Sequence, residues 1–182
     1  NEFGYSRSTC ACRKCQIWCE HQPGYLVPSD LARLIPESDD PIAWAEVHLR
    51  ASLGFKAIVG LMAFCIPSLV PAKQANGHCH WYSNGTCEVH EIAPFGCAFL
   101  DQHMTNTAAE QRNTAGRDAR AEAFQNDELY SQIWEHLWNK GLRYVTTDMD
   151  RHTALQQIAK IDRVIRRKRV WQQEKKRRRK AK

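Results

Sequence analysis

Apolar residues recur at helical spacing along several parts of the chain, and this pattern predicts a mainly α-helical protein. The clearest part is residues 129–138, where leucine, isoleucine, tyrosine and two tryptophans share one face, and Gly141 follows as a stop signal. A second helix is expected to begin at Pro41, behind an aspartate cap, and to continue toward Gly54. Both segments have an apolar face that a core must cover.

Three further segments carry weaker helical signals. Residues 31–35 form a short apolar pattern, and residues 106–124 are rich in alanine and charge, which predicts an exposed helix interrupted or weakened at Gly116. Residues 151–182 begin with apolar residues at helical spacing and end in basic ones. We expect an amphipathic helix that runs into a basic tail.

Strand signals are few and short. Residues 143–147 and 87–90 are the candidates, and the second segment fits a metal-bearing turn equally well. The apolar run over residues 57–72 is interrupted by prolines and is shorter than the ~20 residues of a membrane-spanning helix. We therefore interpret this run as core beside the functional loops.

The cysteines are strongly clustered. All but one of the eight fall into two groups, Cys10-x-Cys12-x2-Cys15-x3-Cys19 and Cys79-x7-Cys87-x9-Cys97. Short spacings let successive thiolates converge on one ion, so the pattern predicts a soft-metal site closed by two distant segments. Zinc, mononuclear iron and an iron–sulfur cluster all suit thiolates, although the familiar ferredoxin spacings are absent.

A disulfide framework is the remaining interpretation of these cysteines. Such frameworks are typical of small secreted chains, whereas 182 residues can bury a core and no stretch resembles a signal peptide. We therefore expect thiols in the cytoplasm or another reducing compartment. The eighth cysteine, Cys65, lies in an apolar run, where a buried and unreactive thiol is the usual finding.

A closed zinc site has four ligands, so the grouped cysteines are one ligand short of two such sites. A histidine or Cys65 can supply the missing ligand. The histidines close to either cysteine group are His21, His78, His80, His90 and His103. No spacing selects His21 or His103, although a loop could bring either within reach.

The two groups and their flanking residues also match a known pattern in order and spacing. The matching stretches are Cys10 to Cys19, Pro28-Ser29-Asp30-Leu31, Cys79-His80-Trp81, Gly85-Thr86-Cys87-Glu88-Val89-His90-Glu91 and Pro94-Phe95-Gly96-Cys97. Over residues 10–105 the chain thus resembles the zinc- or iron-chelating cysteine-cluster proteins, also called the CxxCxxCC family. It departs from them by lacking the adjacent cysteine pair. The resemblance implies metal binding, and His90 stands at the family's Tyr or His position.

The metal ligands predicted from the spacing and the resemblance together are Cys10, Cys12, Cys15, Cys19, Cys79, Cys87, Cys97 and His90. The predicted fold is a single small domain, mainly α with irregular metal-stabilised loops, over residues 5–150. Residues 151–182 are predicted to form its C-terminal helical basic extension.

Charge is distributed as unevenly as the cysteines. Residues 160–182 hold 13 Lys or Arg and 2 Asp or Glu, a net charge of +11, so the rest of the chain carries −5 of the total of +6. A polybasic segment suits nucleic acid, an anionic membrane surface or an acidic protein, and it is also typical of a solvated end. The candidate contact residues are Arg166, Arg167, Lys168, Arg169, Lys175, Lys176, Arg177, Arg178, Arg179 and Lys180. Trp171 is the one aromatic residue among these charges, so a repeated stacking platform is absent.

Enzyme motifs with a defined geometry are absent from the sequence: it has no phosphate loop, nucleophile elbow, His-Glu-x2-His pair or dinucleotide fingerprint. The leading hypothesis is a metal-binding protein with a structural zinc or iron site. The alternative is an iron-dependent redox or oxygen-using enzyme, or an iron–sulfur protein. Catalytic residues and a small-molecule substrate are not indicated by the sequence.

Overall fold

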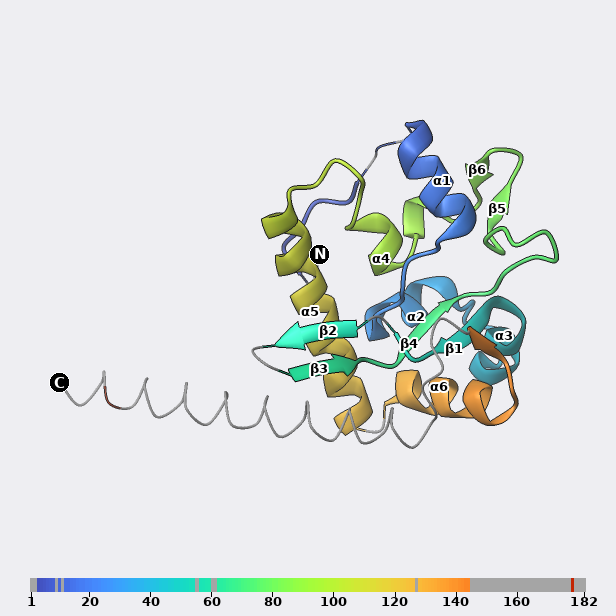
Figure 1. Ribbon diagram of the computed structural model, residues 1–182. Coiled ribbons are helices and arrows are strands. Elements are labelled where there is room, and N and C mark those ends of the chain that lie inside the picture. The colour runs from blue at the N-terminus through green and yellow to red at the C-terminus, as the bar shows by residue number, and fades with distance from the viewer. Residues whose placement is uncertain are drawn as a thin grey trace.

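A computed structural model describes residues 3–8, 10, 12–54, 56–59, 62–126, 128–144 and 178, with the backbone alone for residues 56–59 and 62–64. Along the described part of the chain, a block of helices comes first, a block of strands follows, and a second block of helices precedes one last short strand (Figure 1). The helices are α1 (Arg13–His21), α2 (Pro28–Leu34), α3 (Pro41–His48), the 3-10 turn η1 (His90–Ile92), α4 (Phe95–Ala98), α5 (Asn106–Gln125) and α6 (Leu129–Asn139). More described residues are helical than extended, in agreement with the predicted mainly α class.

The strands form one small sheet and two hairpins. They are β1 (Leu49–Ser52), β2 (Lys56–Val59), β3 (Met62–Cys65), β4 (Ser68–Pro71), β5 (Tyr82–Ser83), β6 (Thr86–Cys87) and β7 (Arg143–Tyr144). In the sheet, β1 lies in the middle, antiparallel to β4 and parallel to β7. The antiparallel pairs β2–β3 and β5–β6 project from the body as hairpins (Figure 1).

The main core lies between α6 and the β1–β4 sheet, and the apolar stripe predicted for residues 129–138 faces it. Ile133, Trp134 and Leu137 are completely buried, and the ring of Trp138 stacks on that of Trp134 with centroids 5.1 Å apart. The indole N–H of Trp134 donates to the carbonyl of Ser52 at 2.8 Å, so this buried ring leaves no unpaired donor. Helix α6 is thereby fixed to β1.

The predicted helix from Pro41 begins as expected but ends earlier. The carboxylate of Asp40 caps α3 by accepting from the N–H of Ala43 at 2.7 Å. The prediction that this helix continues toward Gly54 was wrong, because residues 49–52 form β1. Leu49 and Ala51 are completely buried in the sheet, and pairing with strands remote in sequence outweighs the local helical pattern.

Strands are more numerous than the sequence predicted. The run over residues 57–72 contributes to the core as predicted, since β4 is buried along its whole length, but the strands β2, β3 and β4 in it were not predicted. A continuous apolar run looks alike in a buried strand and a buried helix, which explains the error. The predicted strand at 143–147 begins as β7, and its last three residues lie outside the described residues.

Helix α5 is continuous, so the predicted interruption at Gly116 was wrong. Gly116 is buried where the ring of Tyr25 and the ring of Phe95 press on the helix: an added Cβ would lie 2.6 Å from the Tyr25 hydroxyl and 2.9 Å from Phe95 Cε1. The absence of a side chain allows this close approach. Gly116 is therefore a packing position inside the helix.

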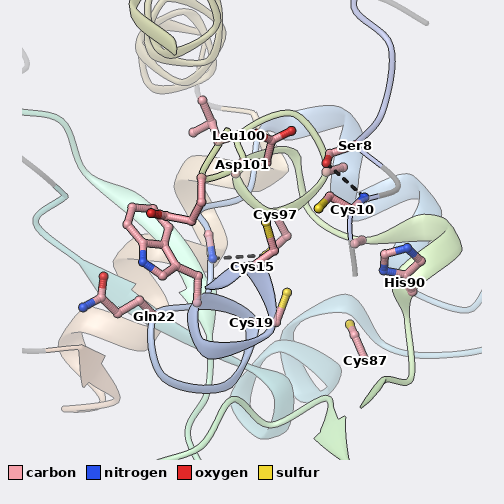
Figure 2. A pocket seen from close by; sticks show the side chains of 16 residues that line it. Ser8, Cys10, Cys15, Cys19, Gln22, Cys87, His90, Cys97, Leu100 and Asp101 are labelled. Atoms are coloured by element: carbon pink, nitrogen blue, oxygen red, sulfur yellow. Dashed lines mark hydrogen bonds between the residues drawn. The ribbon is translucent and has the colours of Figure 1, made fainter. Parts of the chain in front are cut away.

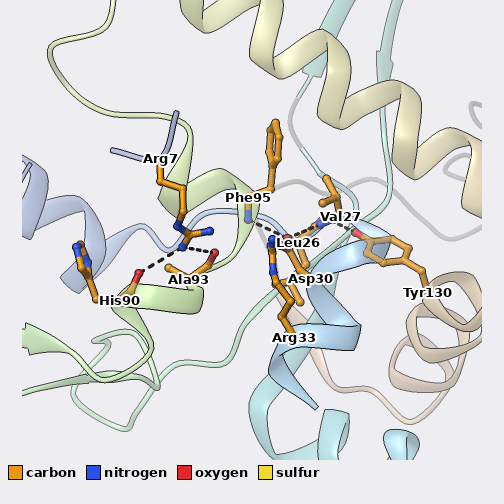
Figure 3. A network of polar contacts seen from close by, with 9 residues as sticks. All are labelled: Arg7, Leu26, Val27, Asp30, Arg33, His90, Ala93, Phe95 and Tyr130. Atoms are coloured by element: carbon orange, nitrogen blue, oxygen red, sulfur yellow. Dashed lines mark hydrogen bonds and ion pairs between the residues drawn. The ribbon is translucent and has the colours of Figure 1, made fainter. Parts of the chain in front are cut away.

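A buried carboxylate holds the segment between α1 and α2 against α4 (Figure 3). One oxygen of Asp30, Oδ2, accepts from the N–H of Val27 and from the N–H of Phe95, both at 2.8 Å. The other oxygen accepts from the guanidinium of Arg33. Burial raises the pKa of Asp30, while the two N–H donors and Arg33 act in the opposite direction. This network fixes the chain just before Cys97.

A buried hydroxyl joins the same segment to the sheet. Tyr130 donates to the carbonyl of Leu26 at 2.9 Å and accepts from the N–H of Leu69 at 2.8 Å. Helix α6, strand β4 and the segment after α1 therefore meet at one side chain.

The predicted extension over residues 151–182 lies outside the described residues, except for Arg178, whose side chain is exposed. The other basic residues predicted as contacts accordingly have no structural description. Among the described helices, none combines the length and the apolar character needed to cross a membrane.

Candidate metal centre

The grouped cysteines gather at one end of the molecule. Helix α1, helix α4 and the β5–β6 hairpin meet there, above the α6 core in Figure 1, although they come from distant parts of the sequence. All seven grouped cysteines are thiols in the structure. Part of the first group lies on a regular helix rather than in an irregular loop, because α1 contains Cys15 and Cys19 and Cys12 is its N-cap residue.

Three cysteines and one histidine form a set of potential metal ligands. The ligand atoms of Cys10, Cys12, Cys15 and His103 all lie within 4.8 Å of one another. Cys12 Sγ is 3.1 Å from Nε2 of His103. Three thiolates and an imidazole are a common ligand set for a closed, tetrahedral zinc ion, and the set could hold one metal ion.

Local structure explains how these side chains meet. Cys12 and Cys15 occupy the cap and the first turn of α1, where unpaired N–H groups and the helix dipole favour negative charge. His103 comes from the loop between α4 and α5, and its N–H donates to the carboxylate of Asp101 at 2.8 Å. This turn directs residue 103 toward α1.

The thiols of this set differ in acidity. The hydrogen bond with His103 lowers the pKa of Cys12 to about 6, whereas burial raises the pKa of Cys15 to about 11. Cys12 is therefore largely a thiolate at neutral pH without any metal, and Cys15 is a thiol. A bound cation would remove this difference, because metal-coordinated thiols are deprotonated.

The other four cysteines lie around the second half of α1. Cys19, Cys87 and Cys97 line a cavity of about 50 Å³ that Cys10 and Cys15 also line (Figure 2). Cys79 is buried beside the end of α1, where its N–H donates to the carbonyl of Glu20 at 2.7 Å. These four sulfurs form a looser group than the first, since no three of them meet the same 4.8 Å limit.

Burial keeps this looser group protonated in the absence of a metal. It raises the pKa of Cys79 to about 11, raises the pKa of Cys97 well above its ordinary value, and raises the pKa of Cys19 and of Cys87. Neighbouring thiols of the same group add to the shift for Cys79, Cys87 and Cys97. The four thiols are thus close enough to influence one another.

A third set of polar groups holds the two cysteine segments together. Glu20 lies 3.3 Å from Nε2 of His78 and 3.7 Å from Nε2 of His21, and the three ligand atoms lie within 4.8 Å of one another. Arg13 reaches the same carboxylate at 3.7 Å. The contact between Glu20 and His78 joins the residue after Cys19 to the residue before Cys79.

The predicted ligands have different positions relative to these sets. The first set contains Cys10, Cys12 and Cys15 as predicted, but its fourth member is His103, which no spacing selected. The imidazole of His90, the histidine predicted as a ligand, lines the cavity instead (Figure 2). The sequence indicated that a histidine could be a ligand, because the seven grouped cysteines are one ligand short of two four-coordinate sites. The turn at Asp101, which only the structure shows, identifies that histidine as His103.

The eighth cysteine, Cys65, is buried in β3.

Comparisons of the chain with protein-family models, with curated proteins and with solved structures found no match. The case for a metal therefore rests on the arrangement of this chain's own side chains.

Proposed function

We propose that the protein binds metal and that Cys10, Cys12, Cys15 and His103 hold one structural zinc ion. The observation that supports this most directly is the approach of all four ligand atoms to within 4.8 Å of one another. In a tetrahedral zinc site with Zn–S distances near 2.3 Å, the ligand atoms are about 3.8 Å apart. Small side-chain movements therefore complete the site.

A structural role follows from the number of ligands. Four protein ligands fill a tetrahedral zinc ion and leave no position for substrate or water. Helix α1 also has little other attachment, because Cys15 is the one buried residue among its nine. The ion would join the start of α1 to the loop carrying His103, 91 residues after Cys12, and so replace packing that this end of the molecule lacks.

Iron is the alternative to zinc at the same end of the molecule. The cavity lined by Cys10, Cys15, Cys19, Cys87 and Cys97 favours it, because thiolates from several segments around one cavity also suit an iron–sulfur cluster. Such a centre would be coloured and redox-active, whereas zinc is colourless and keeps one oxidation state.

For the basic tail we propose sequence-independent binding to nucleic acid, with an acidic protein as the alternative partner. The support is its net charge of +11 within residues 160–182, since each phosphate neutralised by lysine or arginine releases counterions. Fluorescence anisotropy with a labelled duplex should show affinity that falls steeply as salt rises. A chain ending at residue 159 should lose this affinity, and equal binding by both chains would contradict the proposal.

The metal proposal is tested on protein purified without oxygen, by elemental analysis and a visible spectrum of the same sample. We expect zinc and no colour, and we expect Cys12→Ser and His103→Gln each to lose one metal ion per chain. Cys65→Ala is the matched control, since it removes a buried thiol outside both groups, and it should retain the full metal content. Unchanged metal content in both site variants would refute the assignment, and iron with charge-transfer bands would favour the alternative.

A further inference from the structure

The centre proposed above leaves Cys19, Cys79, Cys87 and Cys97 without a role, although four different parts of the chain bring them to one region. Cys19 comes from α1, Cys87 from β6 and Cys97 from α4. Cys79 lies between β4 and β5, and its backbone forms an isolated antiparallel β-bridge with that of Lys73. A hydrophobic core can hold a cysteine, but it does not require four of them from separate segments in one region. Their convergence therefore calls for a specific cause.

Backbone hydrogen bonds position Cys79 and Cys87 beside α1. The N–H of Cys79 donates to the carbonyl of Glu20, which directly follows Cys19. The carbonyl of Cys79 accepts from the N–H of Tyr82 at 3.0 Å, and Tyr82 pairs with Cys87 across the β5–β6 hairpin. Cys19 and Cys87 pack against the same core cluster that contains Cys79. These three cysteines thus share one packed neighbourhood.

Cys97 is brought to the same place by a close backbone contact. The N–H of Gly24 donates to Cys97 Sγ at 3.1 Å, and Gly96 N–H donates to the carbonyl of Tyr25 at 2.9 Å. A Cβ on Gly24 would overlap the backbone of Gly96, so only glycine permits this approach. Hydrogen bonds to ligating side chains orient them and tune the metal, and an N–H donated to sulfur can do this for a thiolate.

We propose that Cys19, Cys79, Cys87 and Cys97 form a second, all-cysteine metal site that takes a zinc ion. Four thiolates satisfy a tetrahedral ion completely, so this site is closed like the first. The inference extends the proposed function, because it assigns the same class of ligand to a separate set of side chains. Together the two sites use every grouped cysteine, and His103 supplies the eighth ligand.

Closing the second site requires its sulfurs to move closer together. Tetrahedral sulfurs at 2.3 Å from zinc lie about 3.8 Å apart, and the present group is wider than that. The β5–β6 hairpin has strands of two residues each, with Asn84 and Gly85 at positive φ in its turn. Such a short hairpin has little stability of its own, so a metal could draw Cys87 toward α1 at low cost. Figure 2 shows Cys19 and Cys87 on facing sides of the cavity.

The test counts metal ions in the full-length chain, purified without oxygen and loaded with zinc or cobalt. We expect about two ions in the wild-type chain, about one in Cys87→Ser, about one in Cys12→Ser, and none in the double variant, because each set holds one ion. In the cobalt-loaded protein, the charge-transfer absorption from thiolate to cobalt should fall in proportion to the coordinated thiolates that are lost. Cys87→Ser should lose about four sevenths of it and Cys12→Ser about three sevenths, because the two sites hold four and three thiolates. The control is again Cys65→Ala, which should keep both ions.

The possible outcomes separate the two assignments. One wild-type ion that Cys12→Ser loses and Cys87→Ser keeps would overturn the second site and leave the first intact. Loss of all metal in either single variant would show one shared polynuclear centre and overturn the separate site. An ion lost in Cys87→Ser but not in Cys12→Ser would support the second site and refute the first.

A measurement on the unmodified chain covers the case in which Cys87→Ser does not fold. Cadmium-113 can replace zinc at thiolate sites, and its NMR frequency depends on how many sulfurs coordinate it. We expect two signals of equal intensity, one from a four-sulfur site and one from a site with three sulfurs and one nitrogen. A single signal would overturn the inference.

Discussion

The carboxylate of Asp30 offers the sharpest test of how the fold supports the cysteine segments. Asp30→Ala would leave the N–H groups of Val27 and Phe95 unpaired, and all three residues are completely buried. An unsatisfied buried donor costs about 1–3 kcal/mol, so the two together give a loss of about 2–6 kcal/mol. That is a large part of the stability of a domain, which is typically about 5–15 kcal/mol.

Asparagine should be tolerated far better at this position. Both N–H groups donate to the same oxygen of Asp30, so one amide oxygen can accept both bonds. The amide NH₂ would then face Arg33, but that side chain is 39% exposed and can turn to water. We expect Asp30→Asn to cost no more than about 1.5–3 kcal/mol, the value of one hydrogen bond to a charged group.

The assay is urea unfolding followed by circular dichroism with zinc in excess, so that metal loading is constant. Asp40→Ala is the matched control, because Asp40 also accepts a helix N–H but is exposed, and its loss should cost about 1 kcal/mol. A cost for Asp30→Ala no larger than that of the control would refute the reasoning. Equal costs for the alanine and asparagine variants would show that the charge, and not the shared acceptor, is the stabilising feature.

Three further outcomes are expected. In metal-stripped protein the alkylation rate of Cys12 should fall as the pH drops through about 6, because its lowered pKa keeps it ionised above that pH. Mass spectrometry should find this midpoint at a higher pH in His103→Gln, because the hydrogen bond with His103 is the largest cause of the lowered pKa. Tyr130→Phe should destabilise the protein by about 2–5 kcal/mol in urea, since it leaves a buried carbonyl and a buried N–H unpaired, whereas Tyr82→Phe should have little effect. Gly24→Ala should lower both the melting temperature and the metal content, because the new Cβ meets backbone and not a movable side chain; unchanged values would contradict the close approach.

The helical part of the fold was predictable where periodicity and burial agree. Residues 129–138 have a full apolar stripe, and α6 occupies almost the same range. Residues 49–52 were not predictable as a strand, because their burial follows from pairing with β4 and β7, and β7 lies more than 90 residues later. Local sequence cannot report a partner so distant, and the helical pattern that precedes β1 continues into it without a break.

The candidate site shows the same division. Cys12 and Cys15 were predictable because their spacing alone brings thiolates together on one turn. His103 was not, since its approach depends on a turn at Asp101 and on the path of α4, which sequence spacing does not contain. His90 as a ligand stays a prediction.

The weak attachment of α1 has a consequence for how the molecule unfolds. Most of its surface faces outward, with Ile17 40% and Trp18 47% exposed, while Trp134 and Trp138 are buried in the main core. Without the ions, this end should therefore unfold at a lower urea concentration than the main core, so that cooperativity is lost. Tryptophan fluorescence and helical circular dichroism would then follow different transitions, and the gap between them would measure how strongly metal couples the two ends.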